Sequence, residues 1–221
     1  LSYIFGIGAI QRCAVFPKDF AVVAENAEEY LREALETAKT FKVEAKRSDK
    51  SFPMKSPEIA IAVGGELHDA FENLEVDVKN PQKVVTAEVR ETNIYVYCKR
   101  EKGLGGMPVG SNSKGMLLLS GGIDSPVAGF MCAKRGLGLE AVHFFSHPYT
   151  SERAKDKVLT LAKLLGKYTG GMKVHIVPFT DIQLAIKEKC PSEQLTIIMR
   201  RFMMAIAEKV AERNGAKALV T

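Results

Sequence analysis

The sequence contains no apolar run long enough to cross a membrane and no closely spaced pair of cysteines. A membrane-spanning helix needs about 18 or more consecutive apolar residues, and no uninterrupted run in this chain approaches that length. The N-terminus shows no signal-peptide pattern. No CxxC motif is present, which argues against a zinc site or a thioredoxin-like motif; the cysteines are Cys13, Cys98, Cys132 and Cys190. We therefore expect a cytoplasmic protein with reduced thiols and no membrane association.

An initiating methionine is also absent, and the chain ends abruptly on KALVT, so we expect it to be part of a longer protein. Its 221 residues suffice for one large domain or two ordinary ones. Hydrophobic residues make up 46% and charged residues 26%, which is the balance of a soluble globular protein. The net charge of +5 is compatible with nucleic-acid binding but does not require it.

The segment GLGGMPVGSNSKG, residues 103–115, divides the chain. It is rich in Gly, Ser and Asn and has almost no apolar period, so we expect a linker. Before it, the hydrophobic spacing predicts a helix from Asp19 to Thr40, a strand from Phe41 and a second helix from Ser56 to about Glu72. The stretch KVVTAEVRETNIYVYCKR then predicts two strands joined by a short turn. These elements form a small α+β unit.

After this segment, apolar strands alternate with helices. Strands are predicted at residues 116–119, 139–145, 173–179 and 217–221. The helices between them begin at Pro126, near Ser151, after Thr180 and near Ser192. This alternation indicates an α/β fold with a doubly wound parallel sheet covered on both faces. Ligands in such folds bind at the carboxyl ends of the strands, and because the chain stops at one such end, we expect the site to be incomplete.

The string SGGIDSP, residues 120–126, lies where a phosphate-binding loop is expected, between a strand and a helix. Gly121 and Gly122 allow a tight turn and a close approach to a ligand. The N–H groups at the start of the helix favour an anion, and Ser120 and Ser125 add hydroxyl donors. The string lacks the GxxxxGK[ST] spacing and its lysine, and it is not a GxGxxG motif, so it belongs to neither of those loop types.

Asp124 is the unusual residue of this loop, because polyphosphate would repel its charge. The repulsion disappears if Asp124 binds Mg²⁺, which prefers carboxylate and phosphate oxygens together, or positions a reacting group. As a helix N-cap, by contrast, Asp124 would need no further explanation. The spacing alone leaves both a nucleotide loop and a capped turn with two glycines open.

The full string resembles the PP-loop of ATP pyrophosphatases, which split ATP between its α and β phosphates. Four segments narrow this resemblance to the tRNA 4-thiouridine synthetase family, also called tRNA sulfurtransferases: GLGGMPVG, LLLSGGIDSPVAGFMCAKRG, EAVHFFSHPYTSERAKDKV and IIMRRFMMAIAEKVAERNGAKALVT. Upstream, KRSDKSFPMKSPEIAIAVGGEL and VDVKNPQKVVTAEVRETNIYVYC resemble the family's THUMP domain, an RNA-binding module, and LSYIFGIGAI resembles the end of its ferredoxin-like domain. The implied parts are the ferredoxin-like end at 1–18, THUMP at 19–102, a linker at 103–115 and an incomplete PP-loop ATP pyrophosphatase domain (adenine nucleotide alpha hydrolase-like) at 116–221.

The resemblance also implies a reaction. ATP adenylates the C4 oxygen of the uridine at position eight of tRNA and releases pyrophosphate. Sulfur from the persulfide of a cysteine desulfurase then displaces AMP and leaves 4-thiouridine. The implied cofactors are ATP and Mg²⁺, and the implied partners are the acceptor stem and 3′ end of tRNA, the desulfurase and a second copy of the chain. Family members also serve as sulfur carriers in the synthesis of the thiamine thiazole.

The resemblance assigns roles to individual residues. Asp124 is the catalytic or Mg²⁺-binding acid, and His143 and Phe144 match an adenosine-contacting pair. Arg200 matches a nucleotide-binding arginine. The remaining ATP-binding positions are Leu118 and Leu119, through their backbone, and Ser120, Gly121, Gly122 and Ser125.

Each assignment outside the loop has an alternative. His143 is also compatible with a satisfied core histidine, and Arg200 with a solvated helix face. Core packing is the simplest interpretation of the apolar residues around Arg200, which are Met199, Phe202, Met203 and Ile206. The family's sulfur-carrying cysteines and a further adenine-binding loop lie beyond Thr221, so we assign no sulfur-carrying role to the four cysteines. Cys132 is expected to fill space in the core.

The segment FKVEAKRSDKSFPMK, residues 41–55, holds five basic and two acidic residues and so carries a net charge of +3. Basic groups with an interleaved aromatic ring can hold phosphates and stack a base. A solvated basic loop is the alternative, and the THUMP resemblance favours RNA. The expected RNA contacts are Lys46, Arg47, Lys50, Phe52 and Lys55.

Three rival functions remain for the chain as a whole. The first is another PP-loop synthetase, and the THUMP-like half of the chain argues against it. An RNA-binding module with an inert nucleotide fold is opposed by the intact SGGIDS string. A THUMP-bearing methyltransferase would need a different glycine-rich loop for its cofactor.

Overall fold

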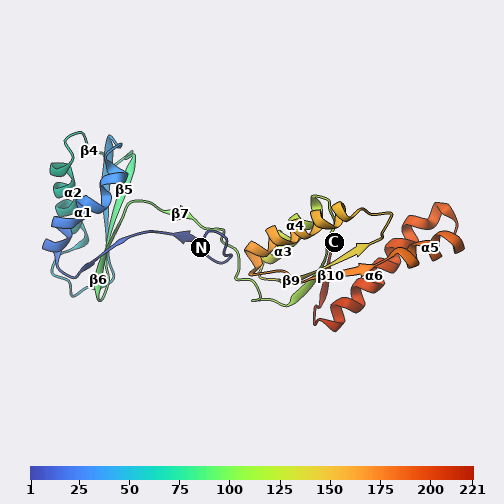
Figure 1. Cartoon of the computed structure of the whole chain (residues 1–221). Helices are drawn as coiled ribbons and strands as arrows, with labels where there is room; N and C mark the ends of the chain where they lie inside the picture. The colour runs from blue at the N-terminus through green and yellow to red at the C-terminus, as the bar shows by residue number, and fades with distance from the viewer. The chain divides into compact units, whose positions relative to one another are not determined.

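The computed structural model describes all 221 residues and divides them into two compact units. Residues 10–101 form an α+β unit. Residues 1–9 and 102–221 together form a unit built on a parallel sheet. Figure 1 shows the elements of each unit. The short strands β1 (Ala9–Ile10) and β7 (Glu101–Lys102) pair where the chain passes from one unit to the other and back.

The α+β unit consists of two helices on one face of a five-stranded sheet (Figure 1). The strands, in sheet order, are β2 (Ala14–Pro17), β6 (Asn93–Tyr97), β5 (Lys83–Val89), β3 (Thr40–Arg47) and β4 (Glu75–Val76). The helices are α1 (Phe20–Leu35) and α2 (Ser56–Ala70). In the sheet, β3 pairs in parallel with β4 and β5, whereas β6 is antiparallel to β5 and β2.

Helix α1 shows why this unit folds as predicted. Asp19 caps the helix by accepting a hydrogen bond from the N–H of Ala21 at 3.0 Å. Its buried residues recur every four positions, which places them on one face toward the sheet: Val23, Ala27, Leu31 and Leu35. The predicted elements are therefore present, although α1 ends at Leu35 rather than at Thr40, and the edge strand β2 was not predicted.

The second unit has a four-stranded, fully parallel sheet in the order β10-β9-β8-β11. Its strands are β8 (Lys114–Leu118), β9 (Gly138–Phe145), β10 (Val174–Pro178) and β11 (Ala218–Val220). The helices are α3 (Asp124–Lys134), α4 (Glu152–Thr169), α5 (Thr180–Lys189) and α6 (Leu195–Arg213), and a short 3₁₀ turn at Ser192–Gln194 precedes α6.

Helices cover both faces of this sheet, as the sequence predicted (Figure 1). On one face, Leu117 and Leu119 pack against Val158 of α4. On the other face, Met116 packs against Ala207 and Ala211 of α6. The alternation of Met116 and Leu117 between two cores explains why the strand is apolar throughout. None of the helices combines the length and the apolar character that a bilayer crossing requires.

Residues 103–115 are not a free linker, which corrects the expectation from their composition. The N–H of Met107 donates to the carbonyl of Lys134 at 2.9 Å, and the N–H of Gly110 donates to the carbonyl of Gly136 at 3.0 Å. Gly106 has a φ of +78°, and a β-carbon there would lie 2.3 Å from the carbonyl oxygen of Lys134. The glycines thus allow close packing against the parallel-sheet unit rather than flexibility.

The first residues of the chain also differ from the expected domain boundaries. Phe5 is 1% exposed and packs in the parallel-sheet unit against Phe130, at a ring distance of 5.0 Å, and Tyr168, at 5.9 Å. The N–H of Gly6 donates to the carbonyl of Gly105 at 2.8 Å. Residues 1–9 and the edge strand β2, which were expected to lie together in residues 1–18, therefore belong to different units.

Candidate functional site

The loop between β8 and α3 is shaped by a pair of serines. The backbone N–H of Ser120 donates to the hydroxyl of Ser125 at 3.0 Å, and the two hydroxyl oxygens lie 3.1 Å apart. The N–H of Gly122 donates to the Ser120 hydroxyl at 3.3 Å. Ser125 is only 8% exposed. Both hydroxyls, expected as donors to phosphate, are thus engaged within the loop and hold its shape.

The two loop glycines leave the space above the loop open. Neither Gly121 nor Gly122 has a positive φ, so neither is needed for a left-handed turn. A β-carbon on Gly121 would meet only atoms of α4, at 3.8 Å or more, and one on Gly122 would meet only the Ser120 hydroxyl, at 3.4 Å. Since both positions adjoin the N-terminus of α3, a ligand can approach the backbone N–H groups closely there.

Asp124 is the first residue of α3, and its side chain is exposed. The N-cap is Ile123, and no side chain caps the helix. The capped-turn interpretation of Asp124 is therefore wrong, because its carboxylate satisfies none of the helix N–H groups. The carboxylate is free to meet a cation or a reacting group.

His143 on β9 is anchored to the start of the loop. Its ring nitrogen Nδ1 lies 3.0 Å from the carbonyl oxygen of Leu119. A carbonyl only accepts, so Nδ1 carries a proton and donates, and Nε2 makes no hydrogen bond within the protein. The ring is half-buried. The alternative of a histidine whose hydrogen bonds are made within the protein therefore holds for Nδ1. Nε2 has no such partner and is available to a ligand beside the loop.

Phe144 does not share the position of His143, because successive side chains of a strand point to opposite faces. Its ring packs on the α6 face and meets Phe179 edge-on at a centroid distance of 5.5 Å. The backbone of Leu119 is also occupied, since its N–H donates to the carbonyl of Val142 at 2.9 Å and its own carbonyl accepts from His143. The structure thus brings the His143 side chain to the loop, but not that of Phe144.

Arg200 lies in the second turn of α6 and is exposed. Because α6 ends just before the start of β11, at the amino edge of the sheet, its first turns lie toward the carboxyl edge, where the loop also lies. Of the apolar neighbours expected in the core, Met199, Met203 and Ile206 are half-buried. Phe202 is 48% exposed, so its assignment to the core is wrong.

The segment after β9 supplies further polar groups at the carboxyl edge that the sequence did not predict. The hydroxyl of Thr180 donates to the carbonyl of His147 at 2.8 Å, and the N–H of Ser146 donates to the hydroxyl of Thr150 at 2.8 Å. The ammonium of Lys155 lies 4.8 Å from the centre of the Phe145 ring. These contacts order the segment between β9 and α4.

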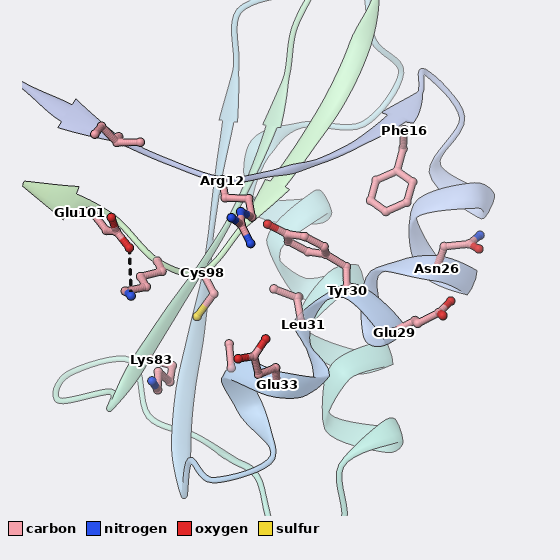
Figure 2. Close-up of a pocket in the computed structure, with 13 residues that line it drawn as sticks. Arg12, Phe16, Asn26, Glu29, Tyr30, Leu31, Glu33, Lys83, Cys98 and Glu101 are labelled. Atoms are coloured by element: carbon pink, nitrogen blue, oxygen red, sulfur yellow. Dashed lines mark ion pairs between the residues drawn. The ribbon is translucent and has the colours of Figure 1, made fainter. Parts of the chain in front are cut away.

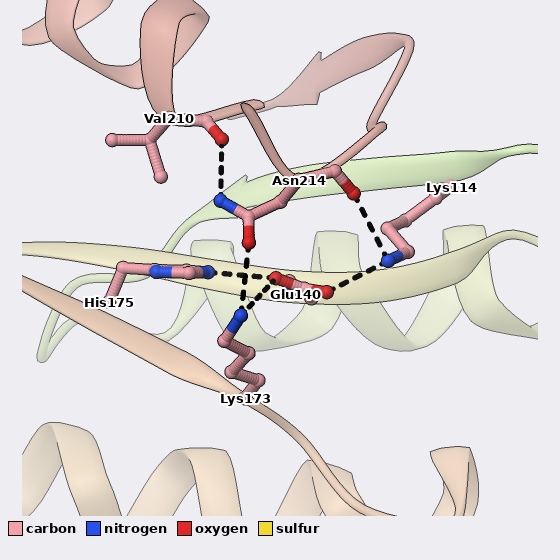
Figure 3. A network of polar contacts seen from close by, with 6 residues as sticks. All are labelled: Lys114, Glu140, Lys173, His175, Val210 and Asn214. Atoms are coloured by element: carbon pink, nitrogen blue, oxygen red, sulfur yellow. Dashed lines mark hydrogen bonds and ion pairs between the residues drawn. The ribbon is translucent and has the colours of Figure 1, made fainter. Parts of the chain in front are cut away.

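A polar network at the opposite, amino edge of the sheet is structural (Figure 3). Glu140 accepts from Lys114 at 2.8 Å and lies 2.7 Å from Nε2 of His175. Burial alone would raise the pKa of Glu140, but the hydrogen bonds from Lys114 and His175 outweigh it and lower that pKa. Lys173 bonds to the side chain of Asn214 at 3.0 Å, so the network ties the end of α6 to the sheet.

The basic segment of the α+β unit, residues 41–55, is called the basic loop below. Hydrogen bonds between its own residues stabilise it. The guanidinium of Arg47 donates to the carbonyls of Phe52 at 3.1 Å and Met54 at 3.0 Å. Phe52 is 6% exposed and belongs to the main hydrophobic core. The expectation that Phe52 stacks a base is therefore wrong, since its ring is buried. Lys46, Lys50 and Lys55 are exposed, as RNA contacts require.

A large groove in the same unit was not predicted (Figure 2). It has a volume of about 1120 Å³ and lies between α1 and the strands at the β2 edge. Arg12, Lys83 and Lys99 line it, and Arg12 points toward Tyr30. Burial raises the pKa of Tyr30. The lining residues are distant in sequence and converge only in the fold, so no local pattern identifies the groove.

Two family models match the chain. The model of the THUMP domain matches residues 17–99. The model described as thiamine biosynthesis protein (ThiI) matches residues 110–221, just over half of the chain. The chain belongs to the ThiI family. The THUMP match lies within the α+β unit and the ThiI match within the parallel-sheet unit.

Similar proteins agree with membership of the ThiI family. A probable tRNA sulfurtransferase of Acetivibrio thermocellus is 54% identical over 223 residues, which cover 100% of this chain and 57% of that protein. One of Alkaliphilus metalliredigens is 52% identical over 220 residues, which cover 99% of this chain and 56% of that protein. The chain therefore spans a little over half the length of these curated relatives.

Two solved structures share the fold. A 4-thiouridine synthetase in complex with RNA and bound ATP superposes with a TM-score of 0.95 at 40% identity, covering 100% of this chain and 58% of that one. A protein of Pyrococcus horikoshii superposes with a TM-score of 0.70 at 24% identity, covering 97% of this chain and 79% of that one, and supports the fold alone. The resemblance to tRNA 4-thiouridine synthetases in the sequence is thus confirmed.

Proposed function

We propose that this chain is the RNA- and ATP-binding part of a tRNA sulfurtransferase, which converts the uridine at position eight of tRNA to 4-thiouridine. The observation that carries the proposal is the serine-closed loop at the N-terminus of α3 with the free carboxylate of Asp124. A THUMP domain in the same chain supplies a means of binding the RNA substrate. The high similarity to a 4-thiouridine synthetase that binds RNA and ATP supports both halves.

In the proposed first step, the C4 oxygen of the uridine attacks the α-phosphorus of ATP, and N3 of the uridine loses its proton to solvent. The bond from that phosphorus to the bridging oxygen breaks, and pyrophosphate leaves with the electron pair. The N–H groups at the start of α3 and the open backbone at Gly121 would bind the departing phosphates. The other ring nitrogen of His143, Nε2, would be available for a hydrogen bond beside the loop.

In the proposed second step, the terminal sulfur of a persulfide provided by a cysteine desulfurase attacks C4 of the adenylated uridine, and AMP leaves. A second thiol then attacks the carrier sulfur, so that the S–S bond to the uridine breaks, 4-thiouridine is released and a disulfide forms, which an external thiol reduces. None of the four cysteines of this chain lies in the loop, and Cys132 on α3 is half-buried, so we assign the sulfur to a group outside them. We also propose that the full protein acts in the cytoplasm as a homodimer, and that it can carry sulfur for thiamine thiazole synthesis, in keeping with the description of its family.

Mg²⁺ fits this site only as a partner of the nucleotide. Among the 221 residues, no three His, Cys, Asp or Glu side chains cluster as a metal site. A single carboxylate together with phosphate oxygens is, however, a usual environment for Mg²⁺. Asp124 would hold the ion, which would offset phosphate charge when bound.

For RNA, we propose that the exposed Lys46, Lys50 and Lys55 contact phosphates. The groove beside Tyr30, with Arg12 on its wall, would take an unpaired nucleotide. These surfaces would receive the acceptor stem and the 3′ end of tRNA.

A direct assay tests the proposal. Full-length protein is incubated with tRNA, Mg-ATP, a cysteine desulfurase and cysteine, and 4-thiouridine is measured by its near-ultraviolet absorbance. The wild type should form it, whereas Asp124→Ala should bind tRNA normally and form none. Thiolation by Asp124→Ala at the wild-type rate would show that the acid is misassigned. A wild type that methylates RNA and forms no 4-thiouridine would refute the function.

A further inference from the structure

The loop between β8 and α3, called the phosphate loop below, carries a negative charge and no positive one. Residues 119–125 contain Asp124 and no lysine, arginine or histidine. Loops of the GxxxxGK[ST] type carry a lysine that meets the β and γ phosphates. Backbone N–H groups and serine hydroxyls are neutral, so they cannot offset the charge of a bound polyphosphate together with that of Asp124. Mg²⁺ held by Asp124 would offset part of this charge, and a cation from elsewhere in the fold would take the place of the missing loop lysine.

Two other cations near the carboxyl edge, Lys155 and Arg200, are placed less well. Lys155 forms an ion pair with Glu152 and lies over the ring of Phe145. Arg200 is on α6, which packs on the other face of the sheet from α3 and α4. Neither side chain is placed against the loop.

Lys157, on α4, does lie against the loop. Its Cδ methylene is 3.8 Å from the point that a β-carbon on Gly121 would occupy. The next residue, Val158, approaches the same point at 3.9 Å and is 1% exposed in the core beside Leu119. Because Val158 is fixed by packing, the helix holds the stem of Lys157 over the loop.

The ammonium of Lys157 is available. The residue is exposed, and none of the ion pairs of the structure includes it. It lies two bonds beyond Cδ, so it can sweep about 2.5 Å further across the open backbone of Gly121 and Gly122. An unpaired ammonium beside free helix N–H groups is an arrangement that binds phosphate.

We propose that Lys157 provides the phosphate-binding cation of this loop from α4, in place of a lysine within the loop. This role rests on the proposed ATP-dependent function. Lys157 would bind the β and γ phosphates of ATP and stabilise the negative charge on pyrophosphate as it leaves. Gly121 keeps the path between the ammonium and the phosphates free of a side chain.

Calorimetric titration of the full-length protein with ATP, pyrophosphate and adenosine tests this role. In Lys157→Met, the Kd for ATP and pyrophosphate should rise at least about tenfold, as for loss of a charge-assisted hydrogen bond. The Kd for adenosine should stay unchanged, because adenosine lacks phosphates. Lys157→Arg should restore most of the pyrophosphate affinity. Lys163→Met is the matched control, since Lys163 is exposed on the same helix, and it should behave as wild type.

Wild-type pyrophosphate affinity in Lys157→Met would overturn the proposal, and so would equal weakening of adenosine, which would indicate a structural role. The 4-thiouridine assay on the wild type distinguishes a failure of the Lys157 assignment from a failure of the proposed sulfurtransferase function. A wild type that binds pyrophosphate through Lys157 but forms no 4-thiouridine would refute the sulfurtransferase and leave the cation assignment intact. A wild type that does not bind pyrophosphate would refute the assignment of Lys157.

Discussion

The basic loop, residues 41–55, and the phosphate loop, residues 120–126, each contain an aspartate, but the two aspartates differ in their hydrogen bonding. In the basic loop, Asp49 pairs with Lys18 and accepts from the N–H of Ser51 at 2.8 Å and from its hydroxyl at 2.6 Å. In the phosphate loop, Asp124 is exposed at the first turn of α3 and caps nothing. A charge whose bonds are satisfied inside the protein supports the fold, and one left free is available to a ligand.

The same contrast separates the other residues of the two loops. Arg47 donates hydrogen bonds to two carbonyls of its own loop, and Phe52 is part of the core. The stem of Lys157 reaches across Gly121, and its ammonium has no protein partner. Composition suggested that the whole basic loop binds RNA, whereas, of its basic residues, only Lys46, Lys50 and Lys55 are exposed and outside the ion pairs.

The largest effect is expected from the buried ring of the basic loop. Phe52→Ala should lower the free energy of unfolding by about 3–5 kcal/mol, because it removes an aromatic side chain from a packed core. Denaturant unfolding followed by circular dichroism measures this. Phe202→Ala, at a 48% exposed ring, is the control and should have a far smaller effect. Unchanged stability with impaired tRNA binding would instead favour base stacking by Phe52.

The next effect concerns the two aspartates. Asp124→Asn should reduce 4-thiouridine formation at least about a hundredfold, as for removal of a group that acts on developing charge. Its melting temperature should not fall, because the Asp124 carboxylate makes no internal bond. Asp49→Asn, the same chemical change, should lower the melting temperature and leave the activity of the folded protein intact. If Asp124→Asn instead lowered the melting temperature and Asp49→Asn abolished activity, Asp124 would be the structural aspartate and Asp49 the functional one.

A smaller effect is expected on RNA affinity. Replacing Lys46, Lys50 and Lys55 together by Gln should weaken tRNA binding and reduce the slope of log affinity against log salt by about 0.7–0.9 for each phosphate that is no longer neutralised. Arg47→Met should leave that slope unchanged and lower stability by about 1–2 kcal/mol, since two carbonyls lose their donor. A reduced slope for Arg47→Met alone would show that Arg47 contacts RNA.

The smallest effect is a pH dependence at Asp49. Hydrogen bonds from Lys18 and Ser51 hold the pKa of Asp49 well below its usual value of 3.8. A depressed carboxylate pKa contributes stability that is fully present above the unfolded-state value and is lost as the pH falls. The difference in melting temperature between wild type and Asp49→Asn should therefore be constant from pH 8 to about pH 5 and shrink below about pH 4. A difference independent of pH would exclude the charged interaction.

The parallel-sheet unit was largely predictable because its signals are local. The apolar run before Ser120, the two glycines and Pro126 in the first turn of a helix describe a strand, a turn and a helix within a few residues. The helix was predicted to begin at Pro126, whereas α3 begins two residues earlier, at Asp124. Whether its carboxylate is used as a cap depends on three-dimensional geometry, and only the structure decided it.

The failed predictions concern contacts made at long range. Residues 103–115 have the composition of a linker, but their partners, Lys134 and Gly136, follow more than 20 residues later. The burial of Phe52 depends on a core built from both helices and the sheet. Lys157 gave no signal, because its relation to Gly121 arises only when α4 packs beside the loop.

The path of the chain decides which residues can be deleted while the parallel-sheet unit stays intact. The N–H of Gly103 donates to the carbonyl of Gly8 at 3.1 Å, so the chain returns to the parallel-sheet unit where it left it. Phe5, ahead of that point, is buried in the same unit. The α+β unit is therefore an insertion with neighbouring ends, and a short turn in place of residues 10–101 would preserve the anchor at Phe5. A fragment that simply began at Lys102 would lose it.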